Sequence, residues 1–591
     1  MHVIATAGHV DHGKSTLVRA LTGQDPDRLE EEQRRGLSIE LGYAWTTLEG
    51  AGDLAFVDVP GHERFISTML AGIGPVPAAL LVVAADDPWM PQAAEHLNAL
   101  DALEVCHGVV AVSRSDLADP APASARVGRE LARTSLRGAP VVQVSGRTGQ
   151  GLGELRARLV AMARTLPSPS PDADVRLWVD RRFTIKGAGT VVTGTLAAGT
   201  VRVGDTLVVG DSPVRVRAVQ SLGRETEAVS GVARVALNLS GDGVALLERG
   251  AAVVTPGAWH HTDVLDVRVS SAHGAPPLPP DRPLLHVGAT SVSGHCRPLS
   301  AELVRLRLDR PVPLRIGDRA LLRDPGSRQI WGVVVADPMP PSLRRRGAAA
   351  ARAEELGAVT CADLVTEVAR RGLVSVADLR RIGVPVDEET VSTTSVVSGG
   401  GWLMSAEHAR AAAAAAVELV TAQERESPLD PGLPVTVLAE RLALPSLDLV
   451  RALLRPPLHM ESGRVRSGRS AALPPAVVTA VETIHQDLED QPFAAPTAHR
   501  LQEVGLDNKA AAAAARAGRL LRLAPGIVLR PGADVLAARW LADLPQPFTT
   551  SEARRRLGTS RRVALPLLDH LDRTGLTRRL PDDRREVTVT P

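Results

Sequence analysis

The residues from Gly8 to Ser15 read GHVDHGKS and match the phosphate-binding pattern G-x-x-x-x-G-K-[S/T]. In this pattern backbone N–H groups surround the phosphate oxygens, a lysine reaches the terminal phosphates and a hydroxyl ligates Mg²⁺. Lys14 and Ser15 occupy those two positions. Lys14 is one of three lysines in a chain with 65 arginines, which fits a site where a planar guanidinium would be too bulky. We therefore expect the phosphate contacts to come from one loop and the start of the following helix: Gly8, His9, Val10, Asp11, His12, Gly13, Lys14, Ser15 and Thr16.

A second motif, Asp-Val-Pro-Gly-His, follows an apolar run and ends at His62. Asp58 can hold Mg²⁺ through water, and Gly61 can offer a backbone N–H to a terminal phosphate with no side chain in the way. His62 can position a water molecule for attack on that phosphate. The motif predicts hydrolysis of the bound nucleotide.

A third motif, Ser-Arg-Ser-Asp at 113–116, stands where N-K-x-D would stand in a guanine-nucleotide domain. Asp116 can accept hydrogen bonds from the guanine N1–H and the exocyclic amine, and adenine offers neither donor. Ser113 replaces Asn, which we expect to weaken the support of the loop. Arg114 replaces Lys, and its aliphatic stem can still cover the base. Ser145 and Gly146 follow the next strand and can donate a backbone N–H to the guanine O6, so the predicted ligand is GTP or GDP with Mg²⁺.

All these motifs require a fold that brings strand ends together. Apolar strands alternate with helical stretches over the first 168 residues, as in a doubly wound α/β domain. Each motif follows a predicted strand, at the sheet edge where such folds bind ligands. The expected strands are Val3–Thr6, Leu54–Asp58, Ala79–Ala84, Gly108–Ser113 and Val141–Ser145, with a first helix over Thr16–Thr22.

The composition limits the function classes. At 591 residues the chain is too long for one core, and its net charge of +1 excludes a uniformly basic nucleic-acid coat. The cysteines at 106, 296 and 361 form no C-x-x-C pair, so neither a disulfide framework nor a zinc site is expected. We expect a cytoplasmic protein without a signal peptide or a membrane partner, because the apolar run Val76–Ala85 is far too short to span a bilayer.

The residue composition and hydrophobic pattern change twice along the chain. After a Pro/Ser linker at 167–171, short β-branched runs and Gly-containing turns predict two β-barrels that divide near 254–261. From about residue 342 the chain is rich in Ala, Arg and Leu, and units of roughly 60 residues each pair helices with a short hairpin, as in winged helices. The expected fold is an α/β P-loop GTPase domain, two β-barrels and tandem winged-helix domains, over 1–170, 171–258, 259–341, 342–405, 406–470, 471–535 and 536–591.

The stretches GHVDHGKS, RRGLSIELGYAW and DVPGHERF resemble the translational GTPases related to elongation factor Tu. Within that group they are most similar to the bacterial selenocysteine-specific elongation factors. The resemblance implies that Ser38 takes the place of the switch threonine and ligates Mg²⁺. It also implies that Val10 and Ile39 flank His62 as an apolar gate.

The barrel segments 183–194 and 317–324 resemble the second and third domains of the same GTPases, which clamp the acceptor end of an aminoacyl-tRNA. The resemblance further implies a pocket for the selenol side chain formed by Tyr43, Arg181 and Arg234. A selenol ionises more readily than a thiol, so paired cations with little access to water would favour it over neutral serine. Without the resemblance, the two arginines read as ordinary surface residues.

The last segment, from Thr549, carries ten arginines and six acidic residues. We expect helices over 552–557 and 560–574 and a hairpin over 576–589. Such a winged helix suggests RNA recognition through the phosphate backbone and an unstacked loop base, and a solvated arginine face is the alternative. The family places its mRNA-hairpin site in this region, so the expected RNA contacts are Arg555, Arg556, Arg561, Arg562, Arg578 and Arg579.

Together these expectations describe a GTPase, acting as a monomer, that delivers selenocysteyl-tRNA to UGA codons while its tail holds the mRNA selenocysteine-insertion hairpin. The ribosome would stimulate its GTP hydrolysis. Two alternatives stay open. One is a generic aminoacyl- or initiator-tRNA carrier GTPase, and the other is a non-catalytic, GTP-regulated RNA-binding protein.

Overall fold

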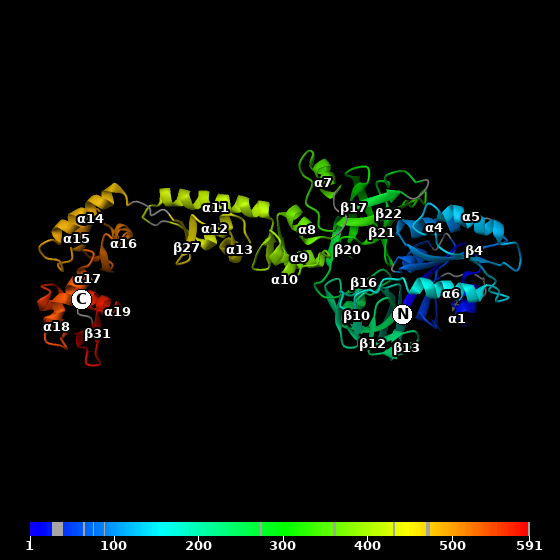
Figure 1. Ribbon diagram of the computed structural model, residues 1–591, viewed down its shortest axis with the longest axis horizontal. Coiled ribbons are helices and arrows are strands. Elements are labelled where there is room, and N and C mark those ends of the chain that lie inside the picture. The colour runs from blue at the N-terminus through cyan, green and yellow to red at the C-terminus, as the bar shows by residue number, and fades with distance from the viewer. Residues whose placement is uncertain are drawn as a thin grey trace. The chain divides into compact units, whose positions relative to one another are not determined.

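The computed structural model describes residues 1–26, 40–62, 66–74, 76–87, 89–187, 189–271, 275–357, 362–429, 432–468 and 473–588 (Figure 1). The chain divides into two compact units, Met1–Thr390 and Val391–Pro591. Among the described residues, no helix combines the length and apolar character needed to cross a membrane.

A six-stranded sheet forms the centre of the first domain, in the order β2-β3-β1-β4-β5-β6. All neighbours are parallel except β2, which pairs antiparallel with β3. Every residue of β4 is buried, because the central strand of a parallel sheet is covered on both faces. The strands are β1 His2–Ala7, β2 Gly42–Leu48, β3 Gly52–Asp58, β4 Ala78–Ala84, β5 His107–Ser113 and β6 Val141–Gln143.

Helices pack around this sheet and complete an α/β domain. They are α1 Lys14–Thr22, α3 Ile66–Ile73, α4 Pro91–Ala102, α5 Ala121–Leu131 and α6 Leu152–Ala163. The predicted strands agree with β1, β3, β4 and β5. The prediction for the last strand was two residues too long, because Val144 and Ser145 already turn toward α6 after β6 ends at Gln143. The prediction also missed β2 altogether.

The second domain is a closed barrel in which β11, β16, β7, β9, β15 and β12 follow one another and β12 pairs again with β11. Strand β8 adds to β9, β13 adds to β12, and β10 pairs with β14 outside the barrel. The strands are β7 Arg176–Trp178, β8 Arg181–Ile185, β9 Gly189–Leu196, β10 Thr200–Arg202, β11 Thr206–Val209, β12 Ser212–Ser221, β13 Arg224–Thr226, β14 Ala228–Ser230, β15 Ala233–Ser240 and β16 Ala252–Val254. We call this domain barrel 2.

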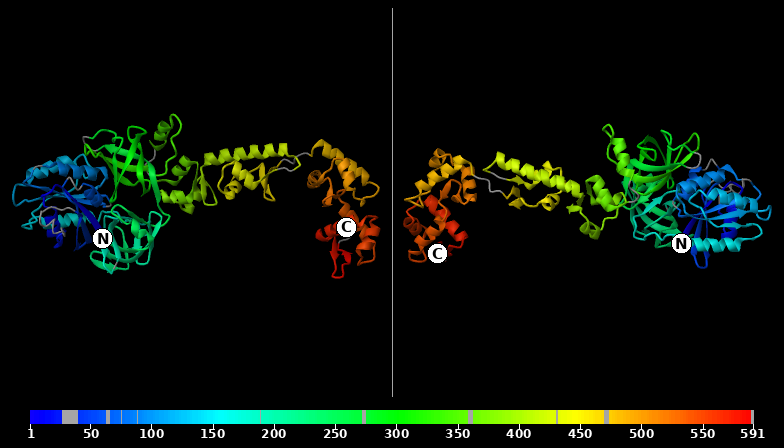
Figure 2. Two further views of the ribbon diagram at one scale, coloured as in Figure 1. Left: turned by 180° about the vertical axis from the view of Figure 1, so that it is seen from behind. Right: turned by 45° about the horizontal axis from the view of Figure 1, so that its top comes forward.

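A second closed barrel, barrel 3, has the order β17-β20-β19-β18-β21-β22. Figure 2 shows the two barrels as separate bodies beside the α/β domain. Trp331 is fully buried in barrel 3, and its indole N–H donates to the carbonyl of Pro276 at 2.7 Å. The strands are β17 His260–Ser271, β18 Leu284–Val287, β19 Thr290–Pro298, β20 Leu303–Leu314, β21 Arg319–Arg323 and β22 Ile330–Asp337.

A buried network of ionised groups joins barrel 3 to the two helices that follow it, α7 Ala348–Gly357 and α8 Leu364–Arg371. Its three carboxylates have no solvent exposure, and each is held by two or more guanidinium groups. We call this set the barrel–helix joint: Asp266, Arg305, Asp337, Arg352, Glu367, Arg370 and Arg371.

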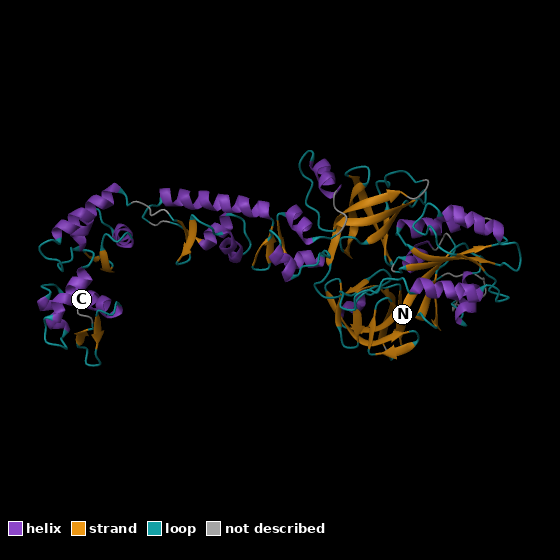
Figure 3. Ribbon diagram, in the orientation of Figure 1, coloured by secondary structure: helices purple, strands orange, loops and turns teal. Residues whose placement is uncertain are grey.

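Helices with short hairpins make up the rest of the chain, whereas strands dominate residues 171–341 (Figure 3). The first unit continues with β23 Leu373–Ser375 and α9 Val376–Arg381, and α10 Glu388–Thr393 spans the division between the units. The second unit contains β24 Val397–Gly399, β25 Trp402–Met404, α11 Ala406–Glu426, β26 Leu433–Pro434, α12 Val435–Arg441, α13 Leu447–Leu453, β27 Leu458–Glu461, β28 Arg464–Ser467, α14 Pro475–Asp487, α15 Ala498–Glu503, α16 Asn508–Arg516, β29 Leu521–Ala524, β30 Ile527–Leu529, α17 Ala533–Ala542, α18 Thr550–Arg556, α19 Arg561–Arg573, β31 Thr577–Arg579 and β32 Arg585–Val587.

The elements from α14 to β32 share one apolar cluster, so the last two helix–hairpin modules are packed as a single body. Phe493 and Trp540 meet edge to face at 5.2 Å between ring centroids. Helix α18 begins with a capping box in which the Thr549 side chain and Glu552 satisfy each other's backbone N–H groups. The predicted helix, helix and hairpin of the tail are confirmed by α18, α19 and the β31–β32 pair.

Candidate functional site

The phosphate loop connects β1 to α1, and its backbone demands glycine at the first position. Gly8 has φ +133°, and a Cβ there would lie 2.1 Å from the carbonyl oxygen of Val82. Lys14 is the first residue of α1 and is only 6% exposed. Its Nζ donates to the carbonyls of Gly8 at 3.1 Å and His9 at 2.8 Å. The ammonium is therefore held inside the loop, where phosphates bind in this motif.

Three oxygen-bearing side chains meet at the start of α1. Asp58, the last residue of β3, is fully buried. Its carboxylate accepts hydrogen bonds from Ser15 Oγ at 2.7 Å and from Thr6 Oγ1 at 2.5 Å. A carboxylate beside a hydroxyl is a set of hard oxygen ligands, which fits Mg²⁺. Ser38, the other predicted ligand, lies outside the described residues, and Thr6 was not among the predicted site residues.

Gly61 lies directly against the phosphate loop. A Cβ at this position would come within 2.6 Å of both Lys14 Nζ and the Val10 nitrogen, so only glycine fits without displacing the loop. His62 follows and is partly buried. The predicted gate cannot be traced further, because Ile39 and residues 63–65 lie outside the described part of the chain.

Ser113, which replaces Asn in the third motif, contacts the phosphate loop directly. Its Oγ donates to the carbonyl of His12 at 2.6 Å, so a hydroxyl connects the end of β5 to the phosphate loop. His12 is completely buried, and burial lowers the pKa of its ring to about 4, so the imidazole is neutral at neutral pH. The expectation that Ser supports the loop less well than Asn would stays a prediction.

The remaining base-site residues lie on the loops that follow β5 and β6. Arg114 adopts φ +56°, pairs with Asp86 at 3.2 Å and donates to the carbonyl of Asp11. Asp116 is exposed, so its carboxylate is accessible to a ligand. Ser145 and Gly146, the two residues of the last motif, each contact a neighbouring residue. Ser145 is buried and its Oγ accepts from the Thr148 N–H, while Gly146 packs beside Thr16 of α1.

A second cavity, of about 210 Å³, lies between the α/β domain and barrel 2, and the three residues of the predicted selenol pocket all line it. Tyr43 comes from β2, Arg181 from β8 and Arg234 from β15. The Arg234 guanidinium carbon lies 3.7 Å from the centroid of the Tyr43 ring, and that of Arg181 lies 5.5 Å from it. The fold thus brings together residues that are up to 191 positions apart in the printed numbering.

Carboxylates that the sequence analysis did not select complete this cluster. Asp180 accepts two hydrogen bonds from Arg234, one of them at 2.7 Å, and one each from Thr193 and Tyr43. Arg181 pairs with Glu40 at 3.0 Å. Burial raises the pKa of the Tyr43 hydroxyl well above its usual value, so this group stays a neutral donor. Each guanidinium already faces an anion, so the pocket is polar and charge-balanced rather than simply basic.

The predicted RNA-contacting arginines differ in how far they are engaged within the chain. Arg556 pairs with Asp543 at 2.6 Å and lies over the Trp540 ring, and Arg562 donates to the carbonyl of Pro496 at 2.8 Å. Arg562 thereby connects the last module to the preceding one, whereas both contacts of Arg556 lie within the last module.

The other four arginines present more of their charge to solvent. Arg578 pairs with Glu586 and Arg579 with Asp583 across or along the β31–β32 hairpin. Arg555 and Arg561 are exposed, and neither forms an ion pair with any residue that the structure describes. These two side chains are therefore the most available for an external phosphate.

The fold and the nucleotide site define a guanine-nucleotide-binding GTPase of the elongation factor Tu type. Residues 1–165 match the Elongation factor Tu GTP binding domain family. Residues 266–342 match the Selenocysteine-specific elongation factor, beta-barrel domain, and residues 539–585 match the Elongation factor SelB, winged helix. The chain is 31% identical to the selenocysteine-specific elongation factor of Desulfomicrobium baculatum over 99% of both chains. It is 32% identical to that of Escherichia coli (strain K12) over 98% of both. The chain belongs to the selenocysteine-specific elongation factors.

Solved structures share the fold. A bacterial selenocysteine-specific elongation factor, EF-Sec, superposes with a TM-score of 0.80, covers 100% of both chains and is 23% identical. The SelB protein of Methanococcus maripaludis, in complex with the GTP analogue GppNHp, covers 57% of this chain and 79% of its own, with a TM-score of 0.52 and 24% identity. The predicted architecture of a GTPase domain, two barrels and a C-terminal winged helix is confirmed.

Proposed function

We propose that the chain is a GTP-dependent elongation factor that delivers selenocysteyl-tRNA to UGA codons on the ribosome. The observation that carries this proposal is the cavity in which Tyr43, Arg181 and Arg234 converge. Membership of the selenocysteine-specific elongation factors supports it, and so does the tail, whose last module matches the winged helix of that family. Acting as a monomer, the chain would hold the aminoacyl end of the tRNA between the α/β domain and barrel 2.

The geometry suggests how the pocket would select selenocysteine over serine. Arg234 is already held in a bidentate pair by Asp180, so an entering side chain must compete with a carboxylate for that guanidinium. A selenolate carries a full negative charge and can compete, whereas a neutral hydroxyl cannot. Selectivity would then arise from a difference between two ionic arrangements in this cavity.

The nucleotide site supports a second part of the proposal. Lys14 would contact the terminal phosphates, and Asp116 would recognise guanine. Ser15, Asp58 and Ser38 would hold Mg²⁺, which neutralises phosphate charge when it is bound. His62 would orient the attacking water, and the ribosome would stimulate that step.

We further propose that the C-terminal modules bind an mRNA selenocysteine-insertion hairpin through phosphate contacts. The exposed arginines Arg555 and Arg561 are best placed for this role, with Arg578 and Arg579 on the hairpin. The proposed domains are 1–170, 171–258, 259–341, 342–405, 406–470, 471–535 and 536–591, and helix α17, Ala533–Ala542, crosses the last of these boundaries.

The test is the affinity of the full-length, GTP-bound protein for selenocysteyl-tRNA compared with seryl-tRNA carrying the same tRNA body. The wild type should prefer the selenocysteyl form. Arg234→Ala should abolish that preference, because it removes the cation for which the selenolate competes. Arg182→Ala is the matched control, since this neighbour of Arg181 lies outside the cavity and donates to the Leu247 carbonyl at 2.9 Å. Equal wild-type affinity for the two charged tRNAs would refute the assignment.

A further inference from the structure

Helix α4 belongs to the cores of two domains at once. It packs against β1 and β4 of the α/β sheet and against β22 of barrel 3. Its residues Leu97 and Leu100 lie in the same apolar cluster as Leu321 and Ile330 of barrel 3. A Cβ on Gly332 of β22 would lie 2.6 Å from the carbonyl of Ala102, so the strand approaches the end of the helix closely. A shift of α4 therefore cannot leave barrel 3 unaffected.

One face of α4 touches the phosphate loop. His96 is 2% exposed, and its Nδ1 accepts a hydrogen bond from the Gly8 N–H at 3.0 Å. Burial lowers the pKa of His96 to about 3, so the ring is neutral at neutral pH and carries its proton on Nε2. Gly8 is the first residue of the loop that also holds Lys14, and its positive φ is one that glycine adopts readily. The hydrogen bond thus ties the entry of the phosphate loop to the position of the helix.

The far end of α4 is held by barrel 3. Arg319, the first residue of β21, donates to the carbonyls of Leu103 at 3.3 Å and Glu104 at 3.1 Å, and it pairs with the Glu104 carboxylate. Arg323, at the other end of β21, lies 3.9 Å from Glu95, the neighbour of His96. A cation at the C-terminal end of a helix also interacts favourably with the helix dipole.

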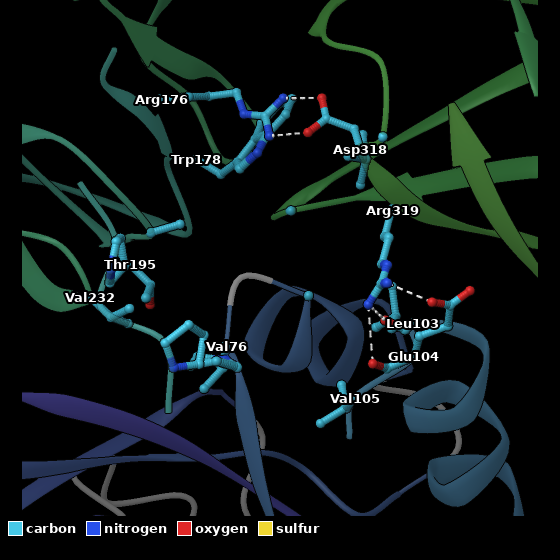
Figure 4. Close-up of a pocket in the computed structure, with 18 of the residues that line it drawn as sticks. Val76, Leu103, Glu104, Val105, Arg176, Trp178, Thr195, Val232, Asp318 and Arg319 are labelled. Atoms are coloured by element: carbon cyan, nitrogen blue, oxygen red, sulfur yellow. Dashed lines mark hydrogen bonds and ion pairs between the residues drawn. The ribbon is translucent and has the colours of Figure 1, made fainter. Parts of the chain in front are cut away.

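Figure 4 shows Arg319 reaching the end of α4 beside a cavity of about 490 Å³ where the α/β domain and both barrels meet. Because side chains do not fill this space, the helix end can move once the arginine is released. The neighbouring Arg176–Asp318 pair, at 2.5 and 2.7 Å, connects the two barrels to each other and does not touch α4.

We propose that α4 couples nucleotide binding to the docking of barrel 3, with His96 as a positioning residue for the phosphate loop and Arg319 as the latch at the opposite end. Guanine nucleotide stabilises the loop conformation in which Gly8 donates to His96, and the same helix position satisfies Arg319. Coupling of this kind is reciprocal, so docking of barrel 3 strengthens nucleotide binding by the factor with which nucleotide strengthens docking.

The first test measures binding of a fluorescent GDP analogue and a fluorescent GTP analogue to full-length variants at position 96. His96→Phe keeps a ring but leaves the Gly8 N–H buried without an acceptor, and affinity should fall about tenfold. His96→Asn offers an amide oxygen near the place of Nδ1 and should restore most of the loss. Unchanged affinity in a folded His96→Phe protein would overturn the positioning role, and so would equal losses in both variants.

The second test concerns the latch. Arg319→Met should weaken nucleotide binding about threefold although the residue lies outside the nucleotide site. Arg268→Met is the matched control, because this barrel 3 arginine also pairs with a glutamate, Glu302, and donates to a helix-end carbonyl, that of Leu356, but faces α7. The control should bind nucleotide as the wild type does. Identical affinities in the two arginine variants would overturn the coupling.

Two further readouts separate coupling from simple destabilisation. In the wild type, nucleotide should slow hydrogen exchange in the segments 100–105 and 319–323, and His96→Phe should abolish that slowing. In a double-mutant cycle, the combined loss of His96→Phe and Arg319→Met should be smaller than the product of the single losses. The proposal would be refuted if hydrogen exchange at 319–323 did not change on nucleotide binding in the wild type. It would also be refuted if the losses of nucleotide affinity in the two single variants multiplied exactly in the double variant.

Discussion

Replacing Arg352 by Met should loosen the barrel–helix joint, because Arg352 is the group that connects α7 to two carboxylates of barrel 3. Its side chain is 2% exposed and donates to Asp266 at 2.8 Å and to Asp337. A third bond, at 2.8 Å, reaches Glu355 within α7 itself. Methionine retains the length of the stem without the charge, so the substitution removes the ionic connection and little of the packing volume.

The expected magnitude follows from the partners that remain. Asp266 keeps two hydrogen bonds from Arg305, at 2.6 and 2.9 Å, and Asp337 keeps Arg370 and Arg371. Stranding a buried charge costs about 3–5 kcal/mol. Since neither carboxylate is stranded here, we expect a smaller loss of about 2 kcal/mol in the docking of α7. That loss corresponds to about a thirtyfold rise in the undocked population.

Hydrogen exchange of the α7 amides measures this equilibrium directly. Arg344→Met is the control, because Arg344 is exposed in the loop before α7. Neighbouring arginines hold the pKa of Asp337 well below its usual range, despite a burial effect in the opposite direction. A depressed pKa contributes stability that is present above the unfolded value of about 3.9 and is lost as the pH falls below it. The free energy of unfolding of the wild type, and with it the protection factor of the α7 amides, should therefore fall below about pH 4. Equal exchange at neutral pH in Arg352→Met and Arg344→Met would refute the reasoning.

Three further substitutions test the nucleotide site and the tail. Ser113→Ala removes the hydrogen bond to the His12 carbonyl and should weaken GDP binding about fivefold by fluorescence titration, and wild-type affinity would contradict a supporting role. Gly61→Ala places a methyl group 2.6 Å from Lys14 Nζ and should reduce GTP affinity and hydrolysis by at least about tenfold, with the same two quantities as the check. Arg561→Met should weaken binding of the mRNA hairpin and lower the slope of log affinity against log salt by about one unit. Arg579→Met should have a smaller effect, because Asp583 already neutralises that side chain, and the reverse order would contradict the proposed contact.

The parts of the site that could be predicted are those with a fixed local spacing. Three motifs can be recognised from a few consecutive residues each: the phosphate loop, the end of the strand at Asp58 and the loop at Ser113. In each case one backbone segment contributes all the groups that the motif needs. Strand β2 was missed although its Tyr, Trp and Thr residues favour strands. The prediction followed continuous apolar runs, which mark strands buried on both faces, and β2 is a half-buried strand at the edge of the sheet.

The unpredicted residues act on partners far away in the sequence. Asp180 was passed over although it stands next to Arg181, since only the pairing of β15 with β9 brings Arg234 toward it. His96 looks like any histidine on an amphipathic helix until α4 is packed beside the phosphate loop, 88 residues away. For the arginines of the tail, composition predicts the overall charge but not the contacts of each side chain. Both Arg561 and Arg562 are exposed, and composition cannot tell that Arg562 donates to the Pro496 carbonyl whereas Arg561 forms no ion pair with the described residues.

The scarcity of lysine has a practical consequence for labelling the protein. Lys14 is buried in the phosphate loop, whereas Lys186 is exposed beside the end of β8 and Lys509 is exposed in α16. Those two reactive amines lie one in each compact unit. Amine-directed fluorophores, used where the N-terminal amine is blocked, would place one dye on barrel 2 and one on the tail without an introduced cysteine. The natural sequence is thus suited to energy-transfer measurements of the distance between the two units, with and without guanine nucleotide.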